Sequence, residues 1–121
     1  MTKFGTTIIC IDGRIQLPIQ NWLKENPGID YVDTMTEHGV VKLFSKPDDT
    51  EQIKSKVPLS IKEDGSEIIL VPGHHDCEGN PIPKNEQIAQ IKNAVSTIKS
   101  WKFPVSVIGA WVDEQLQVES V

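Results

Sequence analysis

The chain has 121 residues, a formal net charge of -5, 38% hydrophobic residues and 24% charged residues. This length fits a single domain over residues 1–121, and the composition is that of an ordinary globular protein. The acidic balance gives no electrostatic support for binding nucleic acid, and no apolar run approaches the roughly 20 residues of a membrane-spanning helix. The first residues show no signal-peptide pattern, so we expect a cytoplasmic protein.

The first 36 residues predict a strand, a helix and a second strand. Residues 6–10 (TTIIC) are short, β-branched and apolar, which is typical of a buried strand. A helix is expected from Pro18, because proline suits a first helical turn, and Pro27-Gly28 should end it. Residues 29–36 alternate well enough to predict another strand.

The middle of the chain predicts a second helix. Residues 37–47 could form either a strand extension or a short helix. From residue 48, acidic side chains and a threonine suit a helix N-terminus, and Gly65 should end the helix. Pro58 is expected to break or restart it.

The last third of the chain predicts three strands and the strongest helix. The strands are expected at residues 67–73, 103–112 and 116–121, with a tight hairpin at 113–115. The helix spans 84–101, and its inward stripe should be Ile88, Ile91, Val95 and Ile98. Alternating strands and helices predict an α/β fold: a mostly parallel central sheet of about five strands flanked by helices, with the last strand antiparallel.

Residues that can bind a metal follow two of the predicted parallel strands. Cys10 ends the first strand, and His74 and Cys77 come just beyond the end of the third. Open α/β sheets bind ligands beyond the carboxyl ends of their strands, and short right-handed crossovers allow these two strands to be neighbours. We therefore expect the two thiols and the imidazole to converge.

Two thiolates and an imidazole suit zinc. The His-x-x-Cys spacing lets both side chains leave one turn toward the same ion. Three protein ligands leave a fourth position free, as in catalytic zinc sites. Water there would have its pKa lowered from about 15.7 toward about 7, which gives hydroxide at neutral pH. The alternatives are that Cys10 and Cys77 are plain buried thiols or form a disulfide.

Asp12 and Arg14 follow Cys10 in the same loop, and two arrangements are consistent with the sequence. Asp12 can bind the metal as a fourth ligand and close the site. Alternatively, Asp12 can pair with Arg14, which would keep the carboxylate ionised and oriented, and accept a hydrogen from water at the free position.

Two motifs, in this order, resemble those of β-class carbonic anhydrases. CIDGR (10–14) is similar to the family's C-x-D-x-R motif, and GHHDC (73–77) is similar to its G-H-x-x-C motif. The tail, residues 105–118, also resembles the family's late strand and hairpin. The resemblance implies a β-carbonic anhydrase-like fold.

The same resemblance implies a zinc lyase that hydrates carbon dioxide to bicarbonate through a zinc-bound hydroxide. Cys10, His74 and Cys77 would bind Zn²⁺, and Asp12 with Arg14 would control whether the site is open. It also implies a homodimer or a higher homo-oligomer.

Two other functions remain open at this point. Related hydrolases with this site act on carbon disulfide or carbonyl sulfide, which would require a narrow apolar pocket formed by the middle segment, residues 35–64. The other is a non-catalytic zinc-binding domain, because this segment lacks the Asn-Ala-Gly loop that usually helps wall the family's active site.

Several polar residues near the motifs have simpler expected roles. His75 is expected to be an exposed or hydrogen-bonding neighbour, with a proton shuttle as the alternative. His38 is expected to be a loop histidine, and Asp76 a turn carboxylate. Gln16 or Gln20 could hydrogen-bond a substrate.

Overall fold

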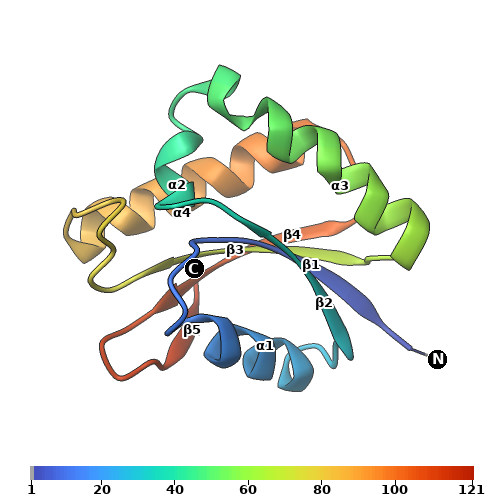
Figure 1. The fold of residues 1–121 in the computed structure, drawn as a ribbon, viewed down its shortest axis with the longest axis horizontal. Helices are drawn as coiled ribbons and strands as arrows, with labels where there is room; N and C mark the ends of the chain where they lie inside the picture. The colour runs from blue at the N-terminus through green and yellow to red at the C-terminus, as the bar shows by residue number, and fades with distance from the viewer. Residues whose placement is uncertain (1) are drawn as a thin grey trace.

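The computed structural model describes residues 2–121 and has a five-stranded sheet with helices on both faces (Figure 1). The strands are β1 (Phe4–Ile9), β2 (Tyr31–Thr36), β3 (Ile68–His74), β4 (Ser106–Val112) and β5 (Val118–Ser120). The helices are α1 (Gln16–Glu25), α2 (Val40–Leu43), the 3₁₀ helix η1 (Pro47–Thr50), α3 (Glu51–Asp64) and α4 (Lys84–Ser100). The predicted α/β class is confirmed.

The strand order of the sheet is β2-β1-β3-β4-β5, and β5 alone runs antiparallel to its neighbour. β1 pairs with β2 on one side and with β3 on the other, where Thr6 lies opposite Ile69. The strand order therefore reverses at β1, which makes the carboxyl ends of β1 and β3 a topological switch point. Open α/β sheets leave a crevice at such a point.

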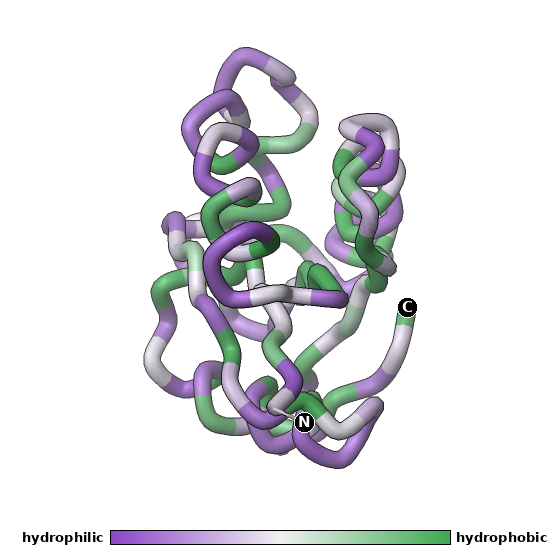
Figure 2. Tube along the Cα trace, turned by 90° about the vertical axis from the view of Figure 1, so that its right-hand side faces the viewer, coloured by the Kyte–Doolittle hydropathy of each residue, from purple (hydrophilic) through white to green (hydrophobic). Residues whose placement is uncertain are grey.

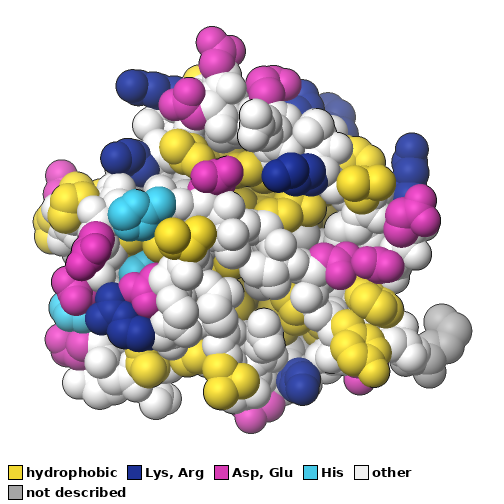
Figure 3. All heavy atoms as spheres, in the orientation of Figure 1, with side chains coloured by type: hydrophobic (Ala, Val, Ile, Leu, Met, Phe, Trp, Pro, Cys, Tyr) yellow, Lys and Arg dark blue, Asp and Glu magenta, His cyan; other side chains and the backbone are white. Residues whose placement is uncertain are grey.

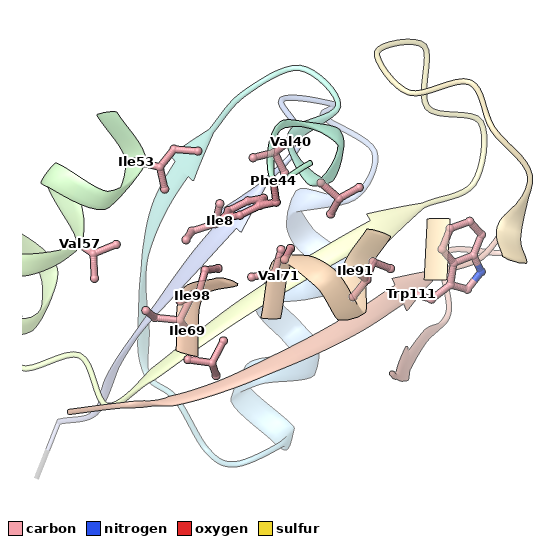
Figure 4. Packing of buried hydrophobic residues seen from close by; sticks show 13 residues of the cluster. Ile8, Val40, Phe44, Ile53, Val57, Ile69, Val71, Ile91, Ile98 and Trp111 are labelled. Atoms are coloured by element: carbon pink, nitrogen blue, oxygen red, sulfur yellow. The ribbon is translucent and has the colours of Figure 1, made fainter. Parts of the chain in front are cut away.

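Alternate side chains of the strands build two apolar cores, because successive strand residues point to opposite faces. Ile8 and Ile69 pack with α2, α3 and α4, whereas Ile9 and Leu70 pack with α1. Figure 4 shows the first core, where side chains of α2, α3 and α4 pack against those of the sheet. Figure 2 shows hydrophobic and hydrophilic residues alternating along the same helices, as expected for elements with one buried face.

The prediction that Pro58 breaks a helix is wrong. α3 runs continuously from Glu51 to Asp64 with Pro58 inside it. Ile53 and Val57 are buried against the sheet, so tertiary packing stabilises a helix that proline weakens. The helix ends before Gly65, whose φ of 73° fits a left-handed C-terminal residue.

The buried face of α4 differs in part from the predicted stripe. Ile91 and Ile98 are buried, as predicted, but Ile88 and Val95 are only half-buried. The buried residues of α4 are Gln87, Ile91, Ala94 and Ile98. The helix is therefore rotated about its axis relative to the prediction.

Smaller differences concern loops and strand ends. The ambiguous segment 37–47 contains the short helix α2. β5 is shorter than the predicted strand at 116–121, and the connection before it runs from Asp113 to Gln117 rather than over 113–115. No helix among residues 2–121 has the length and apolar character needed to cross a bilayer.

Candidate metal centre

The structure brings Cys10, His74 and Cys77 together at the carboxyl ends of β1 and β3. Cys10 directly follows β1, and Cys77 lies in the turn after β3. His74 is the last residue of β3, whereas the prediction placed it just beyond the strand. One donor atom of each residue lies within 4.8 Å of the other two, and all three residues are buried.

The spacing of the sulfur atoms fits a zinc ion. Two Zn–S bonds of about 2.3 Å at a tetrahedral angle place the sulfur atoms about 3.8 Å apart. The Sγ atoms of Cys10 and Cys77 are 3.9 Å apart, far beyond the roughly 2.05 Å of a disulfide. Both cysteines are free thiols in the structure.

The imidazole of His74 is also oriented as a metal ligand. Its Nδ1 lies 2.8 Å from the carbonyl oxygen of His75, so the N–H can donate there and leave a lone pair on Nε2. This Nε2 is buried and has no hydrogen-bond partner among residues 2–121. Because buried polar atoms are nearly always paired, the free nitrogen indicates a position for a ligand such as a metal.

Burial controls the protonation of the Cys77 thiol. Desolvation raises the pKa of Cys77 to about 11, and the neighbouring Cys10 acts in the same direction. The free thiol therefore keeps its proton at neutral pH. A cation bound between the sulfur atoms would displace this proton, because metal binding requires the thiolate.

Asp12 is held by Arg14. The Arg14 Nη2 lies 2.6 Å from Asp12 Oδ2, and the Arg14 backbone N–H and Nε both donate to Asp12 Oδ1, at 2.9 and 3.1 Å. These hydrogen bonds lower the pKa of Asp12 to about 2, so the carboxylate is ionised at neutral pH. Asp12 lies outside the cluster of three donor atoms.

The model of the family described as "Putative carbonic anhydrase" matches residues 1–121, the whole chain. The chain belongs to this carbonic anhydrase family. The resemblance predicted from the CIDGR and GHHDC motifs is therefore confirmed. A comparison with curated proteins finds no match.

In this carbonic anhydrase family member, an open hollow of about 400 Å³ lies beside the cluster. Figure 3 shows histidine, basic and acidic side chains gathered at the left of one face. The residues that line the hollow are Cys10, Ile11, Asp12, Arg14, His38, Asp76 and Glu78. A larger hollow of about 630 Å³ lies between α1 and residues 115–118, and none of the three cluster residues lines it.

The other polar residues considered in the sequence are mostly exposed or hydrogen-bond to a loop of the site. The ring of His75 is exposed, and its Nε2 lies 4.0 Å from the Glu114 carboxylate. His38 is exposed and lines the hollow. The Gln16 side chain donates to the carbonyl oxygens of Cys10 and Asp12, at 2.8 and 3.0 Å. Gln16 therefore holds the loop after β1 in the structure, and this bracing role was not predicted.

Two further contacts at the centre were not predicted. The Gly39 N–H donates to Cys10 Sγ at 3.3 Å. The carbonyl oxygen of Asp76 accepts from Arg14 Nη2 at 3.1 Å, and Asp76 Oδ2 lies 3.4 Å from Arg14 Nη1. The sequence shows only a lone glycine after a predicted strand and an aspartate between two predicted ligands. Neither signal identifies Cys10 or Arg14 as the residue contacted.

Proposed function

We propose that this carbonic anhydrase family member hydrates carbon dioxide to bicarbonate with Zn²⁺ held by Cys10, His74 and Cys77. The observation that carries the proposal is the buried cluster of two sulfur atoms and one imidazole nitrogen at the switch point of the sheet. Its donor chemistry and S–S spacing fit zinc. Family membership supports the lyase class.

Asp12 and Arg14 are the residues proposed to act on the reacting water. Zinc in such a site supplies a Lewis acid that makes water nucleophilic at neutral pH. Arg14 keeps the Asp12 carboxylate ionised and fixed in orientation. Held in this way, the Asp12 carboxylate would accept a hydrogen bond from the reacting water and orient it toward carbon dioxide.

The geometry favours an open site over a site closed by Asp12. A closed site needs a lone pair of the Asp12 carboxylate on the metal. In the structure both carboxylate oxygens accept hydrogen bonds from Arg14. Arg14 in turn contacts Asp76, in the turn that carries Cys77. This arrangement supports catalysis over a purely structural zinc.

The hollow beside the cluster favours carbon dioxide over carbon disulfide or carbonyl sulfide. The two sulfur-containing substrates would require a narrow apolar pocket. The hollow is open to solvent, and its side chains are mostly charged or polar, with Ile11 as an aliphatic exception. The middle segment contributes His38 to this lining rather than an apolar wall.

The remaining expectations about this protein stay predictions. These are the single domain over residues 1–121, the cytoplasmic location, and a homodimer or higher homo-oligomer. Within the described residues, β2 and β5 are the edge strands of the sheet, and each has one side that pairs with no other strand. β5 is short, and its Glu119 and Ser120 are exposed, which gives an assembly interface there little apolar surface.

Metal content is the first test of the proposal. Protein purified without chelator should contain about one zinc per chain, and the variants Cys10→Ser and His74→Ala should lose it. Ser55→Ala, at an exposed position of α3, serves as the control and should retain the metal. A wild-type protein that takes up no zinc when the metal is supplied would contradict the proposal.

Activity is the second test. Stopped-flow hydration of carbon dioxide by zinc-loaded protein should exceed the buffer rate between about pH 7 and about pH 9. The pH series matters because a site closed by Asp12 at low pH would open as pH rises. Zinc-loaded protein with no rate above buffer across this range would contradict the proposal and leave the two alternatives, which assays with carbon disulfide and carbonyl sulfide would separate.

A further inference from the structure

Gly39 lies where the loop after β2 meets Cys10. Its N–H donates to Cys10 Sγ at 3.3 Å, and the residue is buried. Its φ is 61°, in the left-handed region that glycine adopts readily and other residues rarely do. The backbone at this position is therefore shaped so that an amide hydrogen faces the sulfur.

Gly39 also contacts the loop that carries Cys77. A Cβ atom added to Gly39 would lie 2.5 Å from the carbonyl oxygen of Gly79 and 3.1 Å from the backbone nitrogen of Asn80. A Cβ atom added to Gly79 would lie 2.8 Å from the backbone nitrogen of Gly39. The two loops thus touch backbone to backbone, and neither position leaves room for a side chain.

The loop on the far side of this contact carries the second sulfur atom. The Asn80 N–H donates to the Cys77 carbonyl oxygen at 3.2 Å, which closes the loop that carries this sulfur atom. The contact between Gly39 and Gly79 therefore joins the segment that donates to Cys10 Sγ with the loop that carries Cys77.

We propose that Gly39 is a positioning residue for the metal centre: its contact with Gly79 sets the distance between the two sulfur-bearing segments, and its N–H fixes Cys10 Sγ. This inference rests on the proposed function, because it concerns the ion held by Cys10, His74 and Cys77. Gly39 touches no substrate in this assignment. It acts only through the ligands, as outer-shell hydrogen-bond donors do in metal sites.

The test compares zinc affinity in Gly39→Ala, Gly79→Ala and the control Gly65→Ala. Gly65 also has a left-handed φ, 73°, but an added Cβ atom meets nothing within 4 Å, so this variant reproduces the backbone strain without the contact. Competition with a chromophoric chelator should show zinc binding about 10- to 100-fold weaker in Gly39→Ala. Gly65→Ala should bind as the wild type does.

A spectroscopic readout separates positioning from general destabilisation. In cobalt-substituted protein, the sulfur-to-cobalt charge-transfer band reports the geometry of the two thiolates. We expect this band to shift or weaken in Gly39→Ala and Gly79→Ala and to stay unchanged in Gly65→Ala. Because the first two variants disturb one contact, their effects on affinity should combine less than additively in the double variant.

Each outcome decides between the two proposals. Wild-type protein that binds no zinc would overturn the proposed function and this inference with it. Wild-type protein that binds zinc, with folded Gly39→Ala of equal affinity and an unchanged cobalt spectrum, would overturn the inference alone. If Gly39→Ala does not fold, Gly79→Ala decides, because the atom nearest its added Cβ atom belongs to the movable ring of His38.

Discussion

Arg14 holds two segments of the centre together. Its guanidinium contacts the Asp12 carboxylate at 2.6 Å and reaches Asp76, in the turn between His74 and Cys77. Arginine suits this task because its planar group presents several N–H donors at fixed angles. The loop after β1 and the turn after β3 are thus tied at the entrance to the hollow.

Replacing Asp12 should separate catalysis from metal binding. We expect Asp12→Asn to retain zinc and to lose about 10²- to 10⁴-fold in carbon dioxide hydration, because the amide accepts hydrogen bonds from water less well than the ionised carboxylate. Stopped-flow rates and metal content on the same preparation give the comparison. Asp48→Asn, at an exposed position of η1, is the control, and a fully active Asp12→Asn would remove Asp12 from the mechanism.

The carboxyl groups of Asp33 and Asp64 should make stability depend on pH. The pKa of Asp64 is raised by a hydrogen bond with Asp33 and further by desolvation and the Asp33 charge. Because the folded pKa lies above the unfolded value, the stabilisation by this proton is complete below about pH 3.8 and is lost as pH rises through the folded pKa. At neutral pH the two carboxylates repel each other.

Asp64→Asn should therefore raise the thermal midpoint at about pH 7 and change it little at about pH 3. The amide keeps a donor for Asp33 and removes the repulsion. Calorimetry at both pH values measures the difference, with Asp48→Asn as the matched loss of one acidic charge. An equal shift at both pH values would mean that the pair is not responsible.

The residues of the centre could be proposed from sequence because their chemistry and order are specific. Cys10, His74 and Cys77 lie at or just after the carboxyl ends of strands, and the parallel arrangement brings these ends to one edge. Gly39 and Asp76 could not be assigned, because their contacts arise only when separate loops meet in the folded chain. A short motif identifies a metal ligand, but it does not identify the residues that contact this ligand in the folded chain.

At the scale of the elements, α3 shows packing outweighing local propensity. Proline inside a helix removes one backbone hydrogen bond and crowds the preceding turn. Pro58 nevertheless lies within α3, between the buried Val57 and Ser60. A sequence rule that ends helices at proline ignores the buried side chains before and after the proline, which pack the helix against the sheet.

Pro58→Ala should therefore stabilise the protein. The substitution restores a backbone donor and relieves the crowding, so the free energy of unfolding should rise by up to about 3 kcal/mol. Urea unfolding followed by circular dichroism measures the change. Lys56→Ala, at an exposed position of the same helix, controls for helix propensity, and a Pro58→Ala variant no more stable than this control would show that the helix has adapted to proline.

Two glycines of the sheet lie beneath Ile91 of α4. An added Cβ atom on Gly109 of β4 would lie 2.5 Å from Cγ2 of Ile91, and one on Gly73 of β3 would lie 2.8 Å from its Cδ1. Because these two glycines have no side chain, the sheet leaves room there for the side chain of Ile91. Hydrophobic periodicity predicts the apolar stripe of a helix. It does not show which positions of the facing sheet leave room for the helix side chains.

At the scale of the whole molecule, chelator should lower stability if zinc is bound. An ion that binds only the folded chain stabilises it by about 4 kcal/mol when its free concentration is roughly 1,000 times the dissociation constant. We expect the thermal midpoint of zinc-loaded protein to fall on adding EDTA and to recover with excess zinc. Cys10→Ser should show no response to either addition, and an identical response in this variant would point to binding elsewhere.

The α/β class and the antiparallel last strand could be predicted because they follow from the order of the elements. The assignment of α1 to one face and of α2, α3 and α4 to the other was not predicted. It follows from the strand order β2-β1-β3-β4-β5, because right-handed crossovers in opposite directions along a sheet place their helices on opposite faces.

The sequence distance between the two cysteines has a consequence for the order of folding. Cys10 and Cys77 are 67 positions apart, whereas His74 and Cys77 are close neighbours in the chain. In the unfolded polymer, closing so long a loop costs entropy that grows as the logarithm of its length, so an ion captured early would hold only the nearby pair. The third ligand arrives when β1 pairs with β3. Zinc would then complete its coordination only late in folding, linking the N-terminal segment of the chain to the turn after β3. It would be released as soon as β1 and β3 separate.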